Sequence, residues 1–184
     1  TLTGTAAAVA TNYASSGITG LGSSAVTLTD TTAAASALNV INTGTTGTID
    51  ASTVTTLTGT AADVATSYAS TGITGLGNET VTLSGTTATA ADLNRINAGT
   101  SVTVNIGSIL TVTGSVADLN TMYTQAGLVN RGTQALTLTD TSATAVTLST
   151  LDARTTGTIS ASSVLTLTGT AAEISTAFAS TGIT

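Results

Sequence analysis

The chain of 184 residues contains no cysteine, histidine, proline or tryptophan, and its only basic residues are Arg95, Arg131 and Arg154. The absence of cysteine excludes disulfides and cysteine-ligated metals. Histidine and cysteine are also the side chains most often used as catalytic base and nucleophile. The formal net charge of −6 leaves no positive surface to neutralise phosphates, so we expect no nucleic-acid partner.

Aromatic residues and long apolar runs are also scarce. Tyr13, Tyr68, Tyr123 and Phe178 are the only aromatic side chains, too few for a thick globular core but compatible with a thin core extended along an axis. No apolar run approaches the roughly 18 to 20 residues of a membrane span. No lipidation or secretion-signal motif is recognisable, and we therefore expect no membrane insertion.

The sequence consists instead of internal repeats rich in threonine, which supplies roughly a quarter of the residues, far above its use in an ordinary globular domain. Equivalent apolar residues recur at intervals of 55 positions, namely Leu2, Leu57, Val112 and Leu167. Strand-like Thr-apolar-Thr segments begin at alternating intervals of 26 and 29 residues, so each repeat has two related halves. This predicts one continuous array of residues 1–55, 56–110, 111–165 and a partial repeat 166–184. Because neither end carries a polar capping repeat, we expect a longer parent chain.

The shorter half predicts a strand followed by a short helix that begins after Thr60 and continues to about Ser70. Thr60 is a suitable N-cap, and Asp63 lies near the positive end of the helix. Gly72 is expected to adopt a left-handed conformation after the helix. Asn78 and Glu79 then predict a turn before the next strand.

The longer half predicts a second helix with apolar residues three positions apart, at Leu38 and Ile41 and their equivalents Leu93, Ile96, Leu148 and Leu151. We expect this helix to end at Asn42, Asn97 and Asp152. The strand that follows should bury Ile49, Val104 and Ile159, and short polar segments after it predict tight turns.

These elements predict an α/β repeat protein: an elongated, solenoid-like array of strand–helix–strand units with a period of 55 residues, divided 26 and 29. The strands alternate apolar and threonine residues, so one sheet face should be buried and the other wet, with short helices covering one side. We expect a long mixed sheet in which like residues stack at 55-residue intervals, Leu57 above Leu2 and Tyr68 above Tyr13. A curved solenoid resembling leucine-rich repeats is the alternative.

Two segments, TGTIDASTVTTLTGTAADV (46–64) and ASTGITGLGNETVTLSGTTATAADLNRI (69–96), resemble repeats of very large secreted cell-surface proteins of marine cyanobacteria. The resemblance covers essentially the whole chain. It implies an S-layer-like, adhesin-like or motility-associated role outside the cell. Such proteins often carry calcium-binding nonapeptide repeats elsewhere, but the pattern GGxGxDxxx does not occur here, so that calcium site is not transferred to any residue.

Candidate chemical sites begin with the nine acidic residues, Asp30, Asp50, Asp63, Glu79, Asp92, Asp118, Asp140, Asp152 and Glu173. Most stand at predicted helix starts and turns, where carboxylates serve as caps and turn formers. No serine or threonine has a recognisable activating base or a GxSxG motif. We expect no catalytic, cofactor-binding or metal-binding residues and no cofactor. Calcium at Asp30, Asp140, Asp50 or Asn105 would require several converging ligands, and the spacing shows no such cluster.

Three further patterns have a structural and a functional interpretation. The aromatic column Tyr13, Tyr68, Tyr123 and Phe178 could stack on sugars, but its place on the apolar helix face favours a core ladder. The outward threonines, Thr27 and Thr29 with their equivalents Thr82, Ser84, Thr137 and Thr139, could order water or simply face solvent. Asn78-Glu79-Thr80 matches a glycosylation sequon in a turn where asparagine is expected anyway.

Together these observations predict a structural, non-enzymatic repeat segment of a secreted bacterial surface or filament protein, located outside the cell or at its surface. It would act as a scaffold or spacer, with a possible part in adhesion. Its expected partners are further repeats or copies of itself, because the sheet edges at the ends would be unpaired. The alternative is a binding module that uses the threonine-rich sheet face for ice or glycan.

Overall fold

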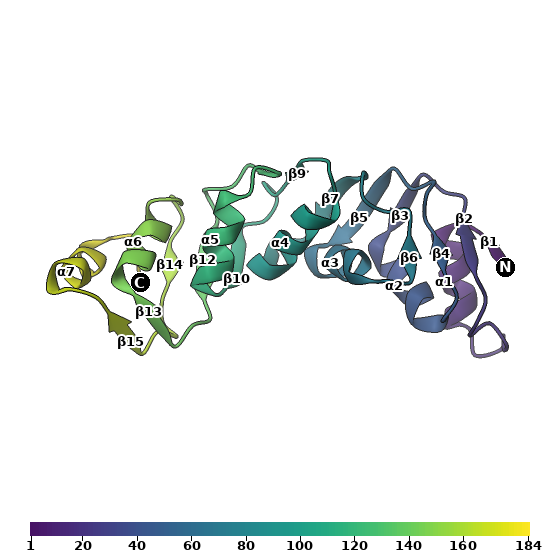
Figure 1. Cartoon of the computed structure of the whole chain (residues 1–184), viewed down its shortest axis with the longest axis horizontal. Helices are drawn as coiled ribbons and strands as arrows, with labels where there is room; N and C mark the ends of the chain where they lie inside the picture. Colours follow the sequence, from purple (N-terminus) through teal and green to yellow (C-terminus); the bar gives the residue numbers. More distant parts are fainter. The chain divides into compact units, whose positions relative to one another are not determined.

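Pairs of short parallel strands joined by short helices form this protein, as shown by a computed structural model that describes all 184 residues. Figure 1 shows the elements along the chain. The chain divides into two compact units, which are described separately. Unit 1 comprises residues 1–84 and 95–104, and unit 2 comprises residues 85–94 and 105–184.

Unit 1 contains two parallel sheets and a row of helices. The first sheet has the order β1 (Leu2–Gly4), β2 (Val26–Leu28), β4 (Ile49–Asp50) and β6 (Ile73–Thr74). The second sheet has the order β3 (Thr32–Ala34), β5 (Thr56–Thr60) and β7 (Thr80–Ser84). Helix α2 (Ala35–Gly44) packs between α1 (Ala6–Ala14) and α3 (Ala61–Ala69).

Unit 2 repeats these elements. Its largest sheet has the order β14 (Ile159–Ser160), β12 (Ala135–Leu138), β10 (Thr111–Gly114) and β8 (Thr87–Thr89). Two smaller sheets pair β13 (Ser142–Thr144) with β15 (Thr166–Thr168), and β9 (Val104–Asn105) with β11 (Leu128–Val129). Helix α6 (Ala145–Asp152) packs against α5 (Val116–Thr124) and α7 (Ala171–Ala179), whereas α4 (Ala90–Gly99) contributes residues to both units.

Neighbouring strands are one turn of chain apart, and this interval differs from the expected one. Leu2 lies opposite Val26 and Val26 opposite Ile49, which are 24 and 23 positions apart. Leu57 lies opposite Ala33 and Val81, each 24 positions away. The prediction that Leu57 stacks on Leu2 was therefore wrong. Each half-repeat makes its own turn, and its strand pairs with the strand of the next half rather than with its copy in the next repeat.

The long mixed sheet was also a wrong prediction, because the sheets are short and their strand pairs are parallel. A parallel pair needs a crossover connection, and the short helix after each strand provides it. The alternation of buried and exposed residues is confirmed: along β7, Val81 and Leu83 are buried while Thr80, Thr82 and Ser84 are exposed. The coarse prediction of an α/β repeat-like fold is thus correct.

The predicted helices are present, and their inward residues form the core. Val64 of α3 is buried, as are Leu38 and Ile41 of α2. The Thr60 hydroxyl accepts a hydrogen bond from the Asp63 N–H at 3.1 Å and donates one to the Asp63 carboxylate at 2.7 Å, which confirms the predicted cap. The second helices end two residues later than predicted in α2 and α4, at Gly44 and Gly99, and at Asp152 in α6, as predicted.

The role predicted for Gly72 was wrong. Helix α3 ends in extended backbone at Ser70, and Gly72 is not among the residues with positive φ. A Cβ at Gly72 would lie 2.4 Å from the side-chain oxygen of Asn42. Glycine is required there because two turns of chain approach each other closely, a tertiary cause that the local sequence does not reveal.

Candidate functional site

The carboxylates of the chain hold backbone and hydroxyl groups in place. Asp63, Asp118 and their equivalents Asp92 and Glu173 each cap the first turn of their own helix, together with a serine or threonine. Asp50 accepts from the Ser52 N–H at 3.0 Å in the turn after β4, and hydrogen bonds from Ser52 lower the pKa of this exposed carboxyl. The interpretation of these acids as caps and turn formers is supported by their contacts.

Two aspartates cap a helix from the neighbouring turn of chain. Asp30 accepts from the Ala6 N–H at the start of α1, with distances of 3.0 and 3.2 Å to its two oxygens. Asp140 does the same for the Val116 N–H of α5 at 2.7 Å. Both were candidates for calcium, together with Asp50 and Asn105, but their oxygens are directed at backbone N–H groups. No three acidic side chains come together in a group suited to a metal ion.

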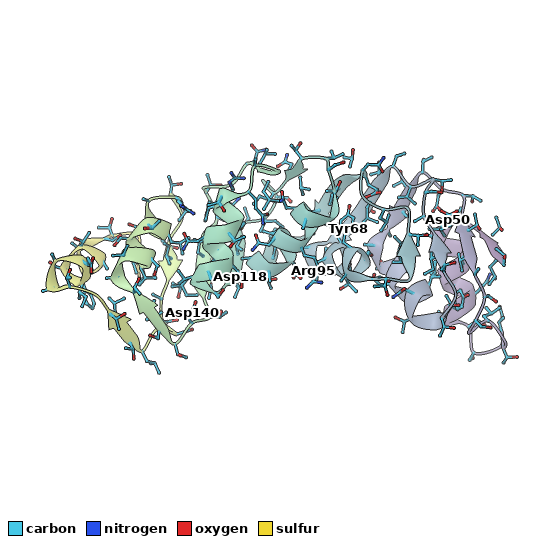
Figure 2. The ribbon with its side chains drawn as sticks, in the orientation of Figure 1. Asp50, Tyr68, Arg95, Asp118 and Asp140 are labelled. Atoms are coloured by element: carbon cyan, nitrogen blue, oxygen red, sulfur yellow. The ribbon has the colours of Figure 1, made fainter.

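The most unusual polar group is Glu79, which is 0% exposed. Its carboxylate accepts from the Gly77 N–H at 2.7 and 2.9 Å, from the Asn78 N–H at 3.3 Å, and from the Tyr68 hydroxyl at 2.9 Å. Figure 2 shows the position of Tyr68 on α3. These neutral donors satisfy a charge that would otherwise be costly to bury. Burial and the neighbouring Glu79 charge raise the pKa of Tyr68.

The same place in the other repeats holds neutral side chains. In unit 2 it is occupied by Gln134, whose Oε1 accepts from the Gly132 N–H at 2.8 Å and whose Nε2 donates to the Asn130 carbonyl at 3.1 Å. In the first repeat it is Ser24, whose carbonyl accepts from the Tyr13 hydroxyl at 3.4 Å. A charge is therefore not required at this position. The common feature is a polar residue that fastens the loop before a strand beneath the aromatic residue of a helix.

The sequence did not predict this cluster, because Glu79 follows Asn78 in an ordinary turn pattern and was assigned to the turn. The available signal was the column Ser24, Glu79 and Gln134, which is polar in every copy and precedes a buried strand residue. A threonine of the following turn completes each cluster: Thr45, Thr100 and Thr155 donate to the carbonyls of these three residues at 2.8, 3.0 and 2.9 Å.

The aromatic column belongs in part to the core. Tyr123 is buried, and Tyr13 and Tyr68 are half-buried, whereas Phe178 on α7 is exposed. A Cβ on Gly99 would lie 2.4 Å from the Tyr68 ring, so the ring packs directly on the end of the next helix. The core interpretation thus holds for the three tyrosines and not for Phe178. Burial raises the pKa of Tyr123, whose hydroxyl is without a hydrogen-bond partner.

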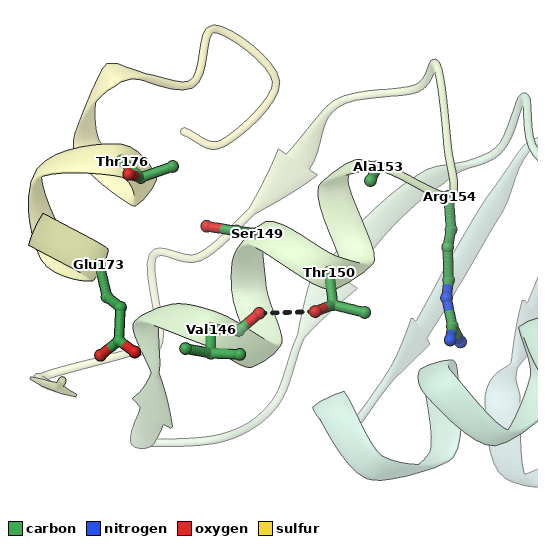
Figure 3. A pocket seen from close by; sticks show the side chains of 7 residues that line it. All are labelled: Val146, Ser149, Thr150, Ala153, Arg154, Glu173 and Thr176. Atoms are coloured by element: carbon green, nitrogen blue, oxygen red, sulfur yellow. Dashed lines mark hydrogen bonds between the residues drawn. The ribbon is translucent and has the colours of Figure 1, made fainter.

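Shallow grooves between neighbouring helices are the main hollows of the surface. The one between α6 and α7 has a volume of about 510 Å³ and is lined by Val146, Ser149, Thr150, Ala153, Arg154, Glu173 and Thr176. Figure 3 shows Glu173 on the α7 side, and Arg154 directed away toward the opposite side. Arg154 donates to the Asn120 carbonyl of α5 at 3.1 Å, and Thr150 to the Val146 carbonyl at 2.8 Å. The two charged groups of the groove therefore do not converge on a common point.

Threonines line up across neighbouring strands, but in a different way from the prediction. Thr27, Thr82 and Thr137, predicted as one column, lie in three different sheets. The observed columns combine both halves of the repeat: Thr32, Thr56 and Thr80 are in register in unit 1, as are Thr89, Thr113 and Thr137 in unit 2. Their side chains are exposed or half-exposed. Asn78 of the sequon is exposed in the turn before β7.

No protein-family model matches the chain, and searches of curated proteins and of solved structures found no match. Among the helices, none has the length and apolar character needed to cross a bilayer.

Proposed function

We propose that this chain is a structural repeat segment of a secreted bacterial surface or extracellular filament protein. It acts as a scaffold or spacer without catalysis and takes part in adhesion. The observation that carries the proposal is the constant interval of 23 or 24 residues between paired strands in both units. A constant interval lets an array be extended by one turn after another without a new kind of contact.

The finer architecture is part of this proposal. We infer a solenoid in which each 55-residue repeat makes two turns, one for each half and each with its own helix. The use of the polar side chains supports a mechanical role. Carboxylates are spent on helix caps, on turns and on the buried Glu79 cluster, and a carboxylate with no exposed surface has no route to a substrate.

Immunogold electron microscopy of the cells that produce this protein tests the proposal. Label on the outer surface or along extracellular filaments is the expected result. Label confined to the cell interior would overturn it.

The second candidate, a threonine face that binds ice or glycan, is favoured by the columns described above. Neighbouring strands lie about 4.8 Å apart and alternate residues of one strand about 6.6 Å apart, so the register of Thr56 and Thr58 with Thr80 and Thr82 forms a regular grid. Methyl and hydroxyl groups on such a grid suit ordered water better than sugar. The aromatic residues that would stack on a sugar stand on helices, and Tyr13 and Tyr68 direct their hydroxyls inward.

Thermal hysteresis of the full chain tests this candidate. If the grid binds ice, the combined substitution Thr82→Lys and Thr113→Lys, one change in each unit, should abolish the activity. Thr66→Lys, on the exposed surface of α3, is the matched control and should retain it. An unmodified chain without thermal hysteresis would rule out ice as the ligand.

A further inference from the structure

The last turn of unit 2 exposes residues that are buried everywhere else in the repeat. Phe178 is 79% exposed, whereas Tyr123, at the same position one repeat earlier, is 9% exposed. Leu167 and Val164 are half-buried, whereas their equivalents Val112 and Ile109 are buried. The residue types are the same, so the difference lies in what covers them.

These residues surround an apolar hollow, which we call the end hollow. It has a volume of about 360 Å³ and is lined by Leu148, Ala161, Ser162, Val164, Leu167, Ala177, Phe178, Ile183 and Thr184. The strand beside it, β15, pairs with β13 on one side only. Since Thr166 donates its N–H to Thr141, Leu167 directs its own N–H and C=O to the free edge. Such an edge can accept another strand.

The internal repeats show which kind of element fills this place. In unit 1, β5 corresponds to β15, and its second edge is covered by the parallel strand β7, with Leu57 opposite Val81 and Thr58 opposite Thr82. The element that fits the end hollow is therefore a parallel strand of the type Thr-apolar-Thr.

The chain presents such a strand with a free edge at β1 in unit 1. Strand β1 lies at the edge of its sheet and pairs only with β2. The Leu2 N–H and the Gly4 C=O face β2, so Thr3 directs its N–H and C=O to the free edge. Leu2 is half-buried. The sequence Thr1-Leu2-Thr3 matches the type Thr80-Val81-Thr82 that covers β5.

We propose that the β15–α7 end of one molecule docks on the β1–α1 end of a second copy of this chain. Strand β1 of the partner subunit adds in parallel beside β15. Leu2 of the partner subunit lies opposite Leu167 and enters the end hollow, and Thr3 of the partner subunit lies opposite Thr168. This inference rests on the proposed scaffold function and names its partner. Two different surfaces meet, so the contact is head-to-tail and can propagate into a filament.

Sedimentation velocity over a wide concentration range, with variants that block one end each, tests the proposal. Phe178→Asp places a charge in the end hollow, and Leu2→Asp places one on the opposite end. The unmodified chain should form a ladder of species longer than a dimer. Each variant alone should remain monomeric, whereas an equimolar mixture of the two should form a dimer and no larger species, because each variant retains the end that the other lacks.

Controls keep the result interpretable. Leu165→Asp changes an exposed leucine outside the end hollow and should leave the ladder unchanged. Thr3→Pro removes only the N–H on the free edge and should block association even if Leu2→Asp disturbs β1, with folding checked by circular dichroism. A monomeric unmodified chain, or a Leu2→Asp variant that still dimerises while Phe178→Asp does not, would overturn the head-to-tail contact. The location of the protein on the cell surface is an independent result, and it alone decides the scaffold proposal.

Discussion

Removing the buried Glu79 carboxylate should show how firmly this polar cluster fastens the loop before β7. The substitution Glu79→Ala deletes the acceptor of the Gly77 and Asn78 N–H groups and of the Tyr68 hydroxyl. Each buried donor left without a partner costs about 1 to 3 kcal/mol. The variant should therefore lose about 3 kcal/mol or more of unfolding free energy, a large part of the stability of a typical domain.

Glu79→Gln is the informative comparison, because unit 2 already uses glutamine in this place. Gln134 accepts from the Gly132 N–H with its oxygen and donates its amide to the Asn130 carbonyl. The residue equivalent to Asn130 in unit 1 is Gly75, which also has positive φ and so presents its carbonyl from a similar backbone conformation. A neutral side chain of the same shape should therefore change the stability by about 1 kcal/mol or less, since it also removes a buried charge.

Urea unfolding followed by circular dichroism measures both changes, and hydrogen exchange of the Gly77 and Asn78 amides reports on the cluster itself. Comparable slopes with urea are needed before the midpoints are converted to free energies. The reasoning fails if Glu79→Ala is as stable as the unmodified chain. It also fails if Glu79→Gln loses as much as Glu79→Ala, because the charge and not the hydrogen-bond geometry would then hold the loop.

Three other substitutions probe the fold. Gly99→Ala should cost about 1 to 3 kcal/mol in urea unfolding, because the new Cβ would lie 2.4 Å from the Tyr68 ring, whereas Gly22→Ala meets no atom within 4 Å and should be neutral. Asp30→Ala should lower the thermal midpoint by an amount equivalent to about 1 kcal/mol, because the Ala6 N–H loses its acceptor; an unchanged midpoint would show that water replaces the carboxylate. Tyr68 has a raised pKa in the folded state, so the folded protein holds that proton more tightly than the unfolded chain. Stability should be fully present below pH 10 and fall as the pH rises above it, and Tyr68→Phe should reduce this slope in melts at increasing pH.

Local elements were predictable because their signals are local. The cap at Thr60 and Asp63, the buried pair Leu38 and Ile41, and the alternation along β7 follow from the periods of helix and strand. Each signal spans a few residues, and no distant partner is needed to interpret it.

The pairing of strands was not predictable in the same way. Both halves of the repeat carry interchangeable Thr-apolar-Thr strands, so the residue opposite Leu57 could equally be a copy in the next repeat or a strand of the next half. The choice depends on how much chain one turn consumes, which is set by the packing of successive helices. Glu79 and Gly72 were misassigned for the same reason, since Tyr68 and Asn42, which explain them, come from another part of the chain.

The constant interval between paired strands has a consequence for how the chain folds. Each new pair closes a loop of the same modest size, so the entropy lost at each closure does not grow with the length of the chain. Contacts stay local, which lowers the relative contact order as repeats are added and favours rapid, stepwise growth from any turn that forms first. The same similarity between strands carries a hazard. A strand that skips one turn finds a partner of nearly the same sequence, and the side-chain clusters at Tyr13, Tyr68 and Tyr123 are the features that distinguish the native register from the shifted one.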